Sequence, residues 1–206
     1  MPKLHFEKPF TQQEAIPEAA KKRVMELLDS GRLHRYNTVG EQWSDAALLE
    51  QSFAQYQGRK YCLACTSGGY GLHIALRAMG LQAGDQVLTN AYTLAPVPGA
   101  IFAAGGKPVL VEIDENYHLD LADLEAKAKS SNAKILLLSL MRGHIPNMEK
   151  LMTLCNQLGL QVLEDCAHTM GGAWMGKKSG NFGQVAAFSL QTYKHLNTGE
   201  GGLVVT

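Results

Sequence analysis

The sequence has 206 residues, of which 46% are hydrophobic and 18% are charged, values typical of a globular protein with a substantial core. Its 19 basic and 19 acidic residues cancel, and no basic block occurs, so we expect no nucleic-acid partner. The N-terminal MPKLHFEKPFTQQEAI lacks the continuous apolar segment of a secretory signal, and the longest apolar run, around 135–141, is too short to span a membrane. These features favour a cytoplasmic protein without a membrane-embedded part.

Two helices are expected ahead of the first strand. Residues 16–30 carry apolar side chains at helical spacing, and Gly31 follows as a stop signal. Residues 44–57 repeat the pattern, and Gly58 ends it. We therefore expect an N-terminal helical segment at about 1–58.

From residue 60 onward, strand-like and helical patterns alternate. Strands are expected at about 60–66, 86–89, 107–112, 134–140, 160–164, 184–189 and 202–206. Helices are expected at about 70–79, 93–104, 121–129 and 147–158, the second of them irregular at its start because it contains two prolines. The pattern predicts an α/β fold in three layers, with a mostly parallel seven-stranded sheet and helices on both of its faces.

The cysteines and histidines do not predict a metal site. Cys62 and Cys65 form a C-x-x-C pair, but they lie in an apolar, strand-like run. A zinc site needs a second pair of ligands, and a redox motif opens a helix, so we interpret these cysteines as structural. The seven histidines show no H-x-x-x-H spacing. We expect no metal.

Candidate ligand-binding residues follow several strands, because open α/β sheets bind ligands at the carboxyl ends of their strands. After the first strand, residues 66–71 form a turn of small residues that enters a helix. This is either a phosphate site made of free backbone N–H groups or a plain tight turn. After the fourth strand, Arg142 is either an anion-binding residue or a solvated loop residue, and His144 lies beside it.

The strongest candidates follow the fifth and sixth strands. Asp165 directly closes an apolar strand, which points its side chain into the crevice, although it could also cap a helix. His168 comes three residues later, and Ser189 and Lys194 follow the sixth strand. Lys194 is either a surface lysine or an amine whose pKa burial lowers. A phosphate site, a carboxylate, a histidine and a lysine on one crevice suit pyridoxal phosphate (PLP), which a lysine holds covalently and an aspartate keeps protonated at its pyridine nitrogen.

Two motifs give the chain a resemblance to a known family. They are E-D-x-A-H at 164–168 and F-S-x-x-x-x-K-x-L-x-x-G-E-G-G at 188–202. With them, the chain from about residue 31 to 206 resembles the DegT/DnrJ/EryC1/StrS family of PLP-dependent aminotransferases, which act mainly on keto-sugar nucleotides. The resemblance implies the large domain of the PLP-dependent transferase fold type I.

The resemblance also implies roles for individual residues. Lys194 would form the aldimine with the cofactor and move protons between the substrate and the cofactor. Asp165 would pair with the pyridine nitrogen, and His168 would lie near the ring's phenolic oxygen. The phosphate would be bound by Gly68, Gly69, Tyr70 and Ser189.

Three positions depart from the family pattern. Gly69 stands where a threonine is usual, so one hydroxyl is missing from the implied phosphate site. Leu94 stands where an aromatic ring usually stacks on the cofactor. The sequence at 142–144 differs from the commoner tyrosine-glycine, which marks Arg142 and His144 as candidate substrate-binding residues.

The implied activity is the transfer of an amino group from an amino acid, glutamate by family habit, to a keto sugar that is nucleotide-linked in the family's manner. The resemblance also implies a homodimer. We expect residues 1–206 to form the PLP-binding large domain and a C-terminal small domain to be absent, as in a truncated chain. Two alternatives stay open. One is a PLP-binding or regulatory module without turnover. The other is a PLP-dependent sugar dehydratase, a subgroup that has histidine in place of the lysine; His195 adjoins Lys194.

Overall fold

A computed structural model describes residues 15–36, 40 and 42–206 of the chain. The chain divides into two compact units, Met1–Asp45 and Ala46–Thr206. The expected segment at 1–58 thus crosses the boundary between the units, and its part at 1–14 lies outside the described residues. In the first unit, helix α1 (Glu18–Ser30) ends where Gly31 turns left-handed at φ 66° and donates to the carbonyl of Leu28. This confirms the helix expected at 16–30.

The remaining elements follow the expected alternation closely. The α-helices are α2 (Asp45–Gln57), α3 (Gly68–Ala78), α4 (Pro96–Ala103), α5 (Leu121–Ser130) and α6 (Met148–Gln157), and a 3₁₀ turn, η1, covers Met141–Gly143. The strands are β1 (Cys62–Cys65), β2 (Gln86–Asn90), β3 (Lys107–Val111), β4 (Ile135–Ser139), β5 (Gln161–Asp165), β6 (Ala173–Trp174), β7 (Lys177–Lys178), β8 (Val185–Ser189) and β9 (Gly202–Val205).

Seven of these strands form one sheet, in the order β1-β9-β8-β5-β4-β2-β3. Strands β3, β2, β4, β5 and β8 pair in parallel, and β9 pairs antiparallel with both of its neighbours. The mostly parallel seven-stranded sheet is therefore confirmed. Because β9 reverses direction between β1 and β8, the carboxyl end of β1 lies at the same edge of the sheet as the carboxyl ends of the parallel strands.

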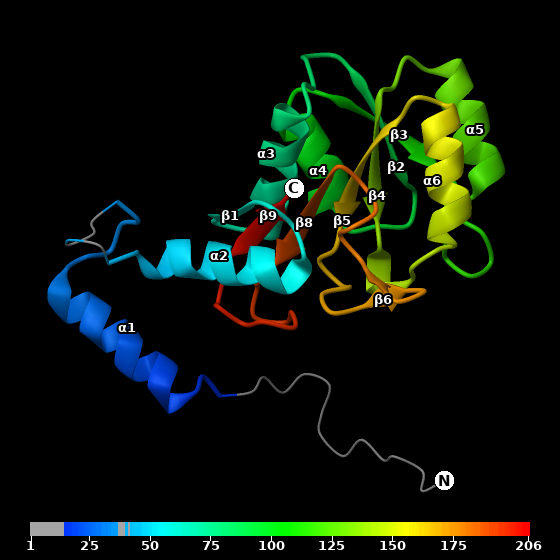
Figure 1. Cartoon of the computed structure of the whole chain (residues 1–206). Helices are drawn as coiled ribbons and strands as arrows, with labels where there is room; N and C mark the ends of the chain where they lie inside the picture. The colour runs from blue at the N-terminus through cyan, green and yellow to red at the C-terminus, as the bar shows by residue number, and fades with distance from the viewer. Residues whose placement is uncertain (1–14, 37–39, 41) are drawn as a thin grey trace, which may run out of the picture. The chain divides into compact units, whose positions relative to one another are not determined.

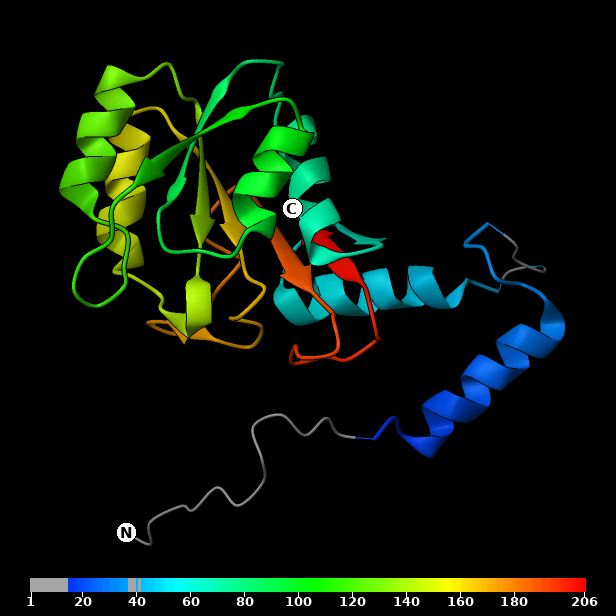
Figure 2. The same cartoon turned by 180° about the vertical axis from the view of Figure 1, so that it is seen from behind.

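Both faces of the sheet are covered by helices, which explains why its central strands read as continuous apolar runs. All five residues of β4 are buried. Leu136 and Leu138 join a cluster that includes residues of α2, α5 and α6, whereas Ile135 and Leu137 join a cluster with residues of α3 and α4. Figures 1 and 2 show α5 and α6 on one side of the sheet and α3 and α4 on the other. The three-layer α/β fold is confirmed.

The structure corrects the sequence interpretation at three places. The helix expected at 70–79 begins at Gly68, because the side chain of Ser67 accepts a hydrogen bond from the N–H of Tyr70 and caps the helix. The helix expected at 93–104 begins at Pro96. The short β6–β7 hairpin was not predicted.

Among the described residues, the structure has no helix that is both long enough and apolar enough to cross a membrane.

Candidate active site

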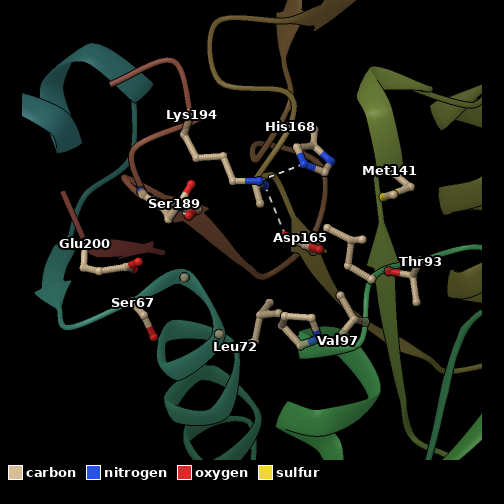
Figure 3. A pocket seen from close by; sticks show the side chains of 16 residues that line it. Ser67, Leu72, Thr93, Val97, Met141, Asp165, His168, Ser189, Lys194 and Glu200 are labelled. Carbon is tan, nitrogen blue, oxygen red and sulfur yellow. Dashed lines mark hydrogen bonds between the residues drawn. The ribbon is translucent and has the colours of Figure 1, made fainter. Parts of the chain in front are cut away.

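A cavity of about 380 Å³ opens at the carboxyl ends of the strands (Figure 3). Its walls come from the N-terminus of α3, from α4 and from the segments that follow β2, β4, β5 and β8. The residues that line it are Ser67, Gly68, Gly69, Leu72, Thr93, Leu94, Pro96, Val97, Met141, Asp165, Ala167, His168, Ser189, Gln191, Lys194 and Glu200. The volume is within the range of small-molecule sites.

The N-terminus of α3 forms one wall of the cavity and suits a phosphate group. The first two residues of this helix, Gly68 and Gly69, have N–H groups that no carbonyl of the helix can reach. The register brings Ser189 to this place, because Gly202 pairs with both Cys65 and Ser189. A Cβ atom on Gly68 would lie 2.8 Å from the Cβ of Ser189. Only glycine therefore allows the helix to approach the end of β8 so closely.

Lys194 lies on a hydrogen-bonded loop between β8 and β9. The N–H of Leu190 donates to the carbonyl of Gly201, and the N–H of Thr192 donates to that of Gly199. These bonds extend the antiparallel pair beyond the sheet. The N–H of Lys194 donates to Gln191, and its side chain enters the cavity.

The amine of Lys194 has His168 as its hydrogen-bond partner. Nζ lies 2.7 Å from Nε2 of His168, as the dashed line in Figure 3 shows. The other ring nitrogen, Nδ1, accepts the backbone N–H of Arg142 at 3.1 Å. Burial lowers the pKa of Lys194, and the nearby Arg142 adds to this, while Asp165 opposes it. Burial is the largest cause of the lowering of the pKa of His168 to about 4.

Asp165 ends β5 with its carboxylate inside the protein. The residue is 9% exposed, and burial raises the pKa of its carboxyl group. One oxygen accepts the N–H of Ala167 at 3.1 Å, and the other accepts the hydroxyl of Ser139 at 3.4 Å. The hydroxyl of Ser139 lies 2.7 Å from that of Thr93. A chain of two hydroxyl groups thus leads from the cavity wall to the carboxylate.

The residue before Asp165 supports the site from behind. The fully buried Glu164 accepts three backbone N–H groups, from Gly180, Phe182 and Gly183, each at 2.7 Å. Arg59 donates to the carbonyls of Gly180 and Gly183. The two side chains therefore fix the turn that precedes β8, the strand that ends at the cavity.

Most of the candidate residues from the sequence meet at this cavity. Gly68, Gly69, Leu94, Asp165, His168, Ser189 and Lys194 all line it. The side chains of the other three candidates lie outside this lining. Tyr70 is exposed, stacks on His73, and uses its N–H to bond the capping hydroxyl of Ser67. Arg142 reaches the site through its backbone, and His144 packs against Tyr117.

Two kinds of residue at the site escaped the sequence interpretation. The sequence places Ser139 in a buried strand, and the available signal for a further role is a single hydroxyl at the carboxyl end of the run ILLLS. Gln191 and Glu200, which also line the cavity, lie inside the lysine motif but carried no role. Loop geometry alone brings them to the wall.

The groups present fit pyridoxal phosphate. The start of α3 and the hydroxyl of Ser189 offer donors for a phosphate, and Lys194 offers an amine. The carboxylate of Asp165 has no cation in hydrogen-bonding contact among its partners in the described structure, so a protonated pyridine nitrogen would satisfy it. Fold and site together define an α/β protein with a cavity, at the carboxyl ends of its strands, whose groups suit pyridoxal phosphate.

Comparisons with known proteins identify the family. Residues 14–206 match the model of the DegT/DnrJ/EryC1/StrS aminotransferase family. The GDP-perosamine synthase of Caulobacter vibrioides is 37% identical over 159 residues, which are 77% of this chain and 43% of that protein. The pleiotropic regulatory protein of Geobacillus stearothermophilus is 33% identical over 92% of this chain and 50% of its own length.

Solved structures agree with the sequence comparisons. The aminotransferase from Psychrobacter cryohalolentis superposes with a TM-score of 0.86 and 26% identity, over 96% of this chain and 49% of that one. The chain thus spans about half the length of the relatives it matches. It belongs to the DegT/DnrJ/EryC1/StrS aminotransferase family, whose cofactor is pyridoxal 5′-phosphate.

Proposed function

We propose that this chain carries the cofactor site of an aminotransferase that moves an amino group from an amino acid, glutamate in the first instance, to a nucleotide-linked keto sugar. The observation that carries the proposal is the position of Lys194, whose amine lies in the same cavity as the buried carboxylate of Asp165 and the N-terminus of α3. The family match and the names of the relatives support the choice of reaction.

Each side chain has a task that follows from its position. When bound, pyridoxal phosphate supplies a carbonyl that takes up the amino group and a ring that withdraws electrons from the substrate. The N–H groups of Gly68 and Gly69 and the hydroxyl of Ser189 would hold its phosphate. Asp165 would keep its pyridine nitrogen protonated. The amine of Lys194 would bind it and move the proton of the substrate's α carbon.

The walls of the cavity add to this arrangement. Leu72, Val97 and Met141 present apolar surface to the cavity, which lowers the local water content and strengthens the interactions of the polar groups. Leu94 also lines the cavity and would offer apolar contact where the family usually has an aromatic ring.

The donor half of the reaction tests this proposal without knowledge of the acceptor. The chain would be loaded with pyridoxal phosphate and mixed with glutamate, and 2-oxoglutarate and the aminated cofactor would be measured by mass spectrometry. We expect one oxo acid per occupied site, and none from Lys194→Ala. The matched control Lys107→Ala changes an exposed lysine on β3 and should behave as the parent chain. Failure of the loaded parent chain to aminate its cofactor with any amino acid would overturn the proposal.

Product masses separate the alternative activities. A dehydratase would release water from the keto sugar, whereas an aminotransferase exchanges oxygen for nitrogen. Lys194 occupies the cavity, and the adjacent His195 lines a separate groove with Leu49, Phe53 and Tyr56, which favours the aminotransferase. A binding or regulatory module would bind the cofactor without aminating it.

The setting of the enzyme is part of the same proposal. We propose that it works in the cytoplasm as a homodimer with an amino acid and a keto sugar as its small-molecule substrates. The four free cysteines support a reducing compartment. The dimer is supported by the family resemblance and would be measured by sedimentation equilibrium.

A further inference from the structure

The hydrogen bonds of His168 specify which of its ring nitrogens carries the proton. A backbone N–H can only donate, so Nδ1 of His168, which accepts the N–H of Arg142, must present its lone pair. The proton of the neutral ring therefore lies on Nε2. A doubly protonated ring, with a hydrogen on each nitrogen, is incompatible with this bond.

The same reasoning extends to Lys194. Nε2 of His168, which carries the proton, lies 2.7 Å from Nζ of Lys194, so the lysine nitrogen must accept this hydrogen bond. Only a neutral amine has the lone pair to do so, because an ammonium group has donors alone. We propose that the backbone N–H of Arg142 fixes the tautomer of His168 and thereby holds Lys194 as a neutral amine in the cofactor-free chain.

The local backbone conformation holds the N–H group of Arg142 within hydrogen-bonding distance of Nδ1 of His168. Arg142 has a left-handed conformation, φ 55° and ψ 19°, which is uncommon for a residue with a side chain. Hydrogen bonds from Gly143 to Leu140 and from His144 to Met141 hold the turn. The N–H of Leu140 donates to the carbonyl of Asp165, which ties the turn to the strand that leads to His168. Arg142 and His168 are positioning residues in this proposal.

The charged groups around the lysine act in both directions. Asp165 favours the ammonium form of Lys194, whereas the side chain of Arg142 and burial disfavour it. The charges of Arg142 and His195 lower the pKa of His168, which favours its neutral ring. Glu200 also lines the cavity. The hydrogen bond from His168 is the contribution that distinguishes the two forms of the amine by geometry.

A neutral amine is the form that attacks a carbonyl or accepts a proton. The inference rests on the proposed function only for the use made of this amine. The protonation states themselves can be measured in the chain without cofactor. Failure to bind or aminate pyridoxal phosphate would therefore refute the proposed function. The protonation states of His168 and Lys194, measured without cofactor, would still test the further inference.

The first test reads the tautomer directly. Long-range ¹H–¹⁵N correlation spectra of the cofactor-free chain, labelled with ¹⁵N-histidine, would be recorded at neutral pH and assigned through the loss of signals in His168→Gln. We expect His168 to be neutral with its proton on Nε2. Arg142→Gly keeps the N–H group and suits the left-handed backbone, so its His168 should show the same tautomer. A proton on Nδ1, or a doubly protonated ring, would overturn the inference.

The second test measures the protonation state of the Lys194 amine. The pH dependence of reductive methylation at Lys194 would be followed by peptide mass in the parent chain, His168→Gln and the control His118→Gln, with the exposed Lys107 as internal reference for the reagent. The amide of a glutamine side chain has both a donor and an acceptor and can rotate. It can therefore turn its oxygen to Lys194 and accept a hydrogen bond from an ammonium group. We expect the labelling midpoint of Lys194 to rise by about one to two pH units in His168→Gln alone. An unchanged midpoint would show that burial alone sets the state of the amine, and the inference would fall.

Discussion

Adjacent glycines at the start of α3 are expected to respond in opposite ways to the same substitution. In Gly68→Ala the new Cβ would lie 2.8 Å from the Cβ of Ser189 and 3.2 Å from its Cα. In Gly69→Ala the nearest atom would be the Cβ of Pro96 at 3.7 Å, an ordinary contact. Neither glycine has a positive φ, so alanine can adopt both backbone conformations. Contact with β8 is therefore the difference between the two sites.

The size of the difference follows from these contacts. Overpacking in a well-packed region costs about 1–3 kcal/mol. Replacing glycine by alanine at a compatible site stabilises a chain by about 0.4–1 kcal/mol, and both variants receive this gain. Because the gain cancels in the comparison, Gly68→Ala should be less stable than Gly69→Ala by about 1–3 kcal/mol. Gly69→Ala itself should be at least as stable as the parent chain.

Urea unfolding of the cofactor-free variants, followed by circular dichroism, measures this difference. A titration with pyridoxal phosphate then reports on the site: Gly68→Ala should bind it more weakly, because the clash moves the N–H groups of α3 away from Ser189. Two variants of equal stability, to within about 0.5 kcal/mol, would refute the reasoning. They would show that β8 or the helix can shift without cost.

Three further predictions concern the carboxylates and the histidine. Glu164→Gln turns one buried acceptor into a donor that faces an N–H group, so we expect a loss of about 1–3 kcal/mol in urea unfolding, and no loss for the exposed Glu115→Gln. Ser139→Ala removes a hydroxyl from Asp165, which should weaken binding of pyridoxal phosphate about fivefold, for about 1 kcal/mol; unchanged binding would contradict this role. Folding lowers the pKa of His168 from 6.5 to about 4, so the unfolded chain binds the proton more readily than the folded chain. The stability that neutral His168 contributes is therefore present above pH 6.5 and is lost as the pH falls through about 4. The stability of His168→Gln should depend less on pH in this window, and equal slopes for the two chains would contradict the assignment.

The sheet could be predicted from sequence because its central strands are buried on both faces. The run ILLLS of β4 and the apolar runs of β5 and β8 have no other stable environment, and glycines such as Gly31 and Gly58 mark the helix ends. The direction of β9 could not be predicted, because an apolar run of four residues reads the same in a parallel and an antiparallel strand. Its pairing is decided by the loop that carries Lys194.

The site was predictable where chemistry is tied to one residue type. Asp165 and Lys194 were found because an acid at a strand end and a lysine before a glycine-rich turn are unusual for solvated side chains. The backbone N–H of Arg142 could not be found in this way, because its role comes from a left-handed turn and would not depend on the side chain at all. Ser139 escaped for a related reason: its importance comes from Asp165 lying beside it in the parallel register.

The position of β9 in the sheet gives the cofactor site an order of assembly. Strand β1 is synthesised first of the seven, yet its neighbour in the sheet is β9, which comes last among them. Pairs so distant along the chain close late and slowly. A nascent chain that has reached β5 already contains Asp165 and α3, and Leu72 and Leu76 of α3 can pack against Leu163 of β5. Strand β1, however, has no partner in the sheet until β9 is made. Ser189 and Lys194 reach the cavity only with β8 and the loop before β9, so the cofactor site is completed last.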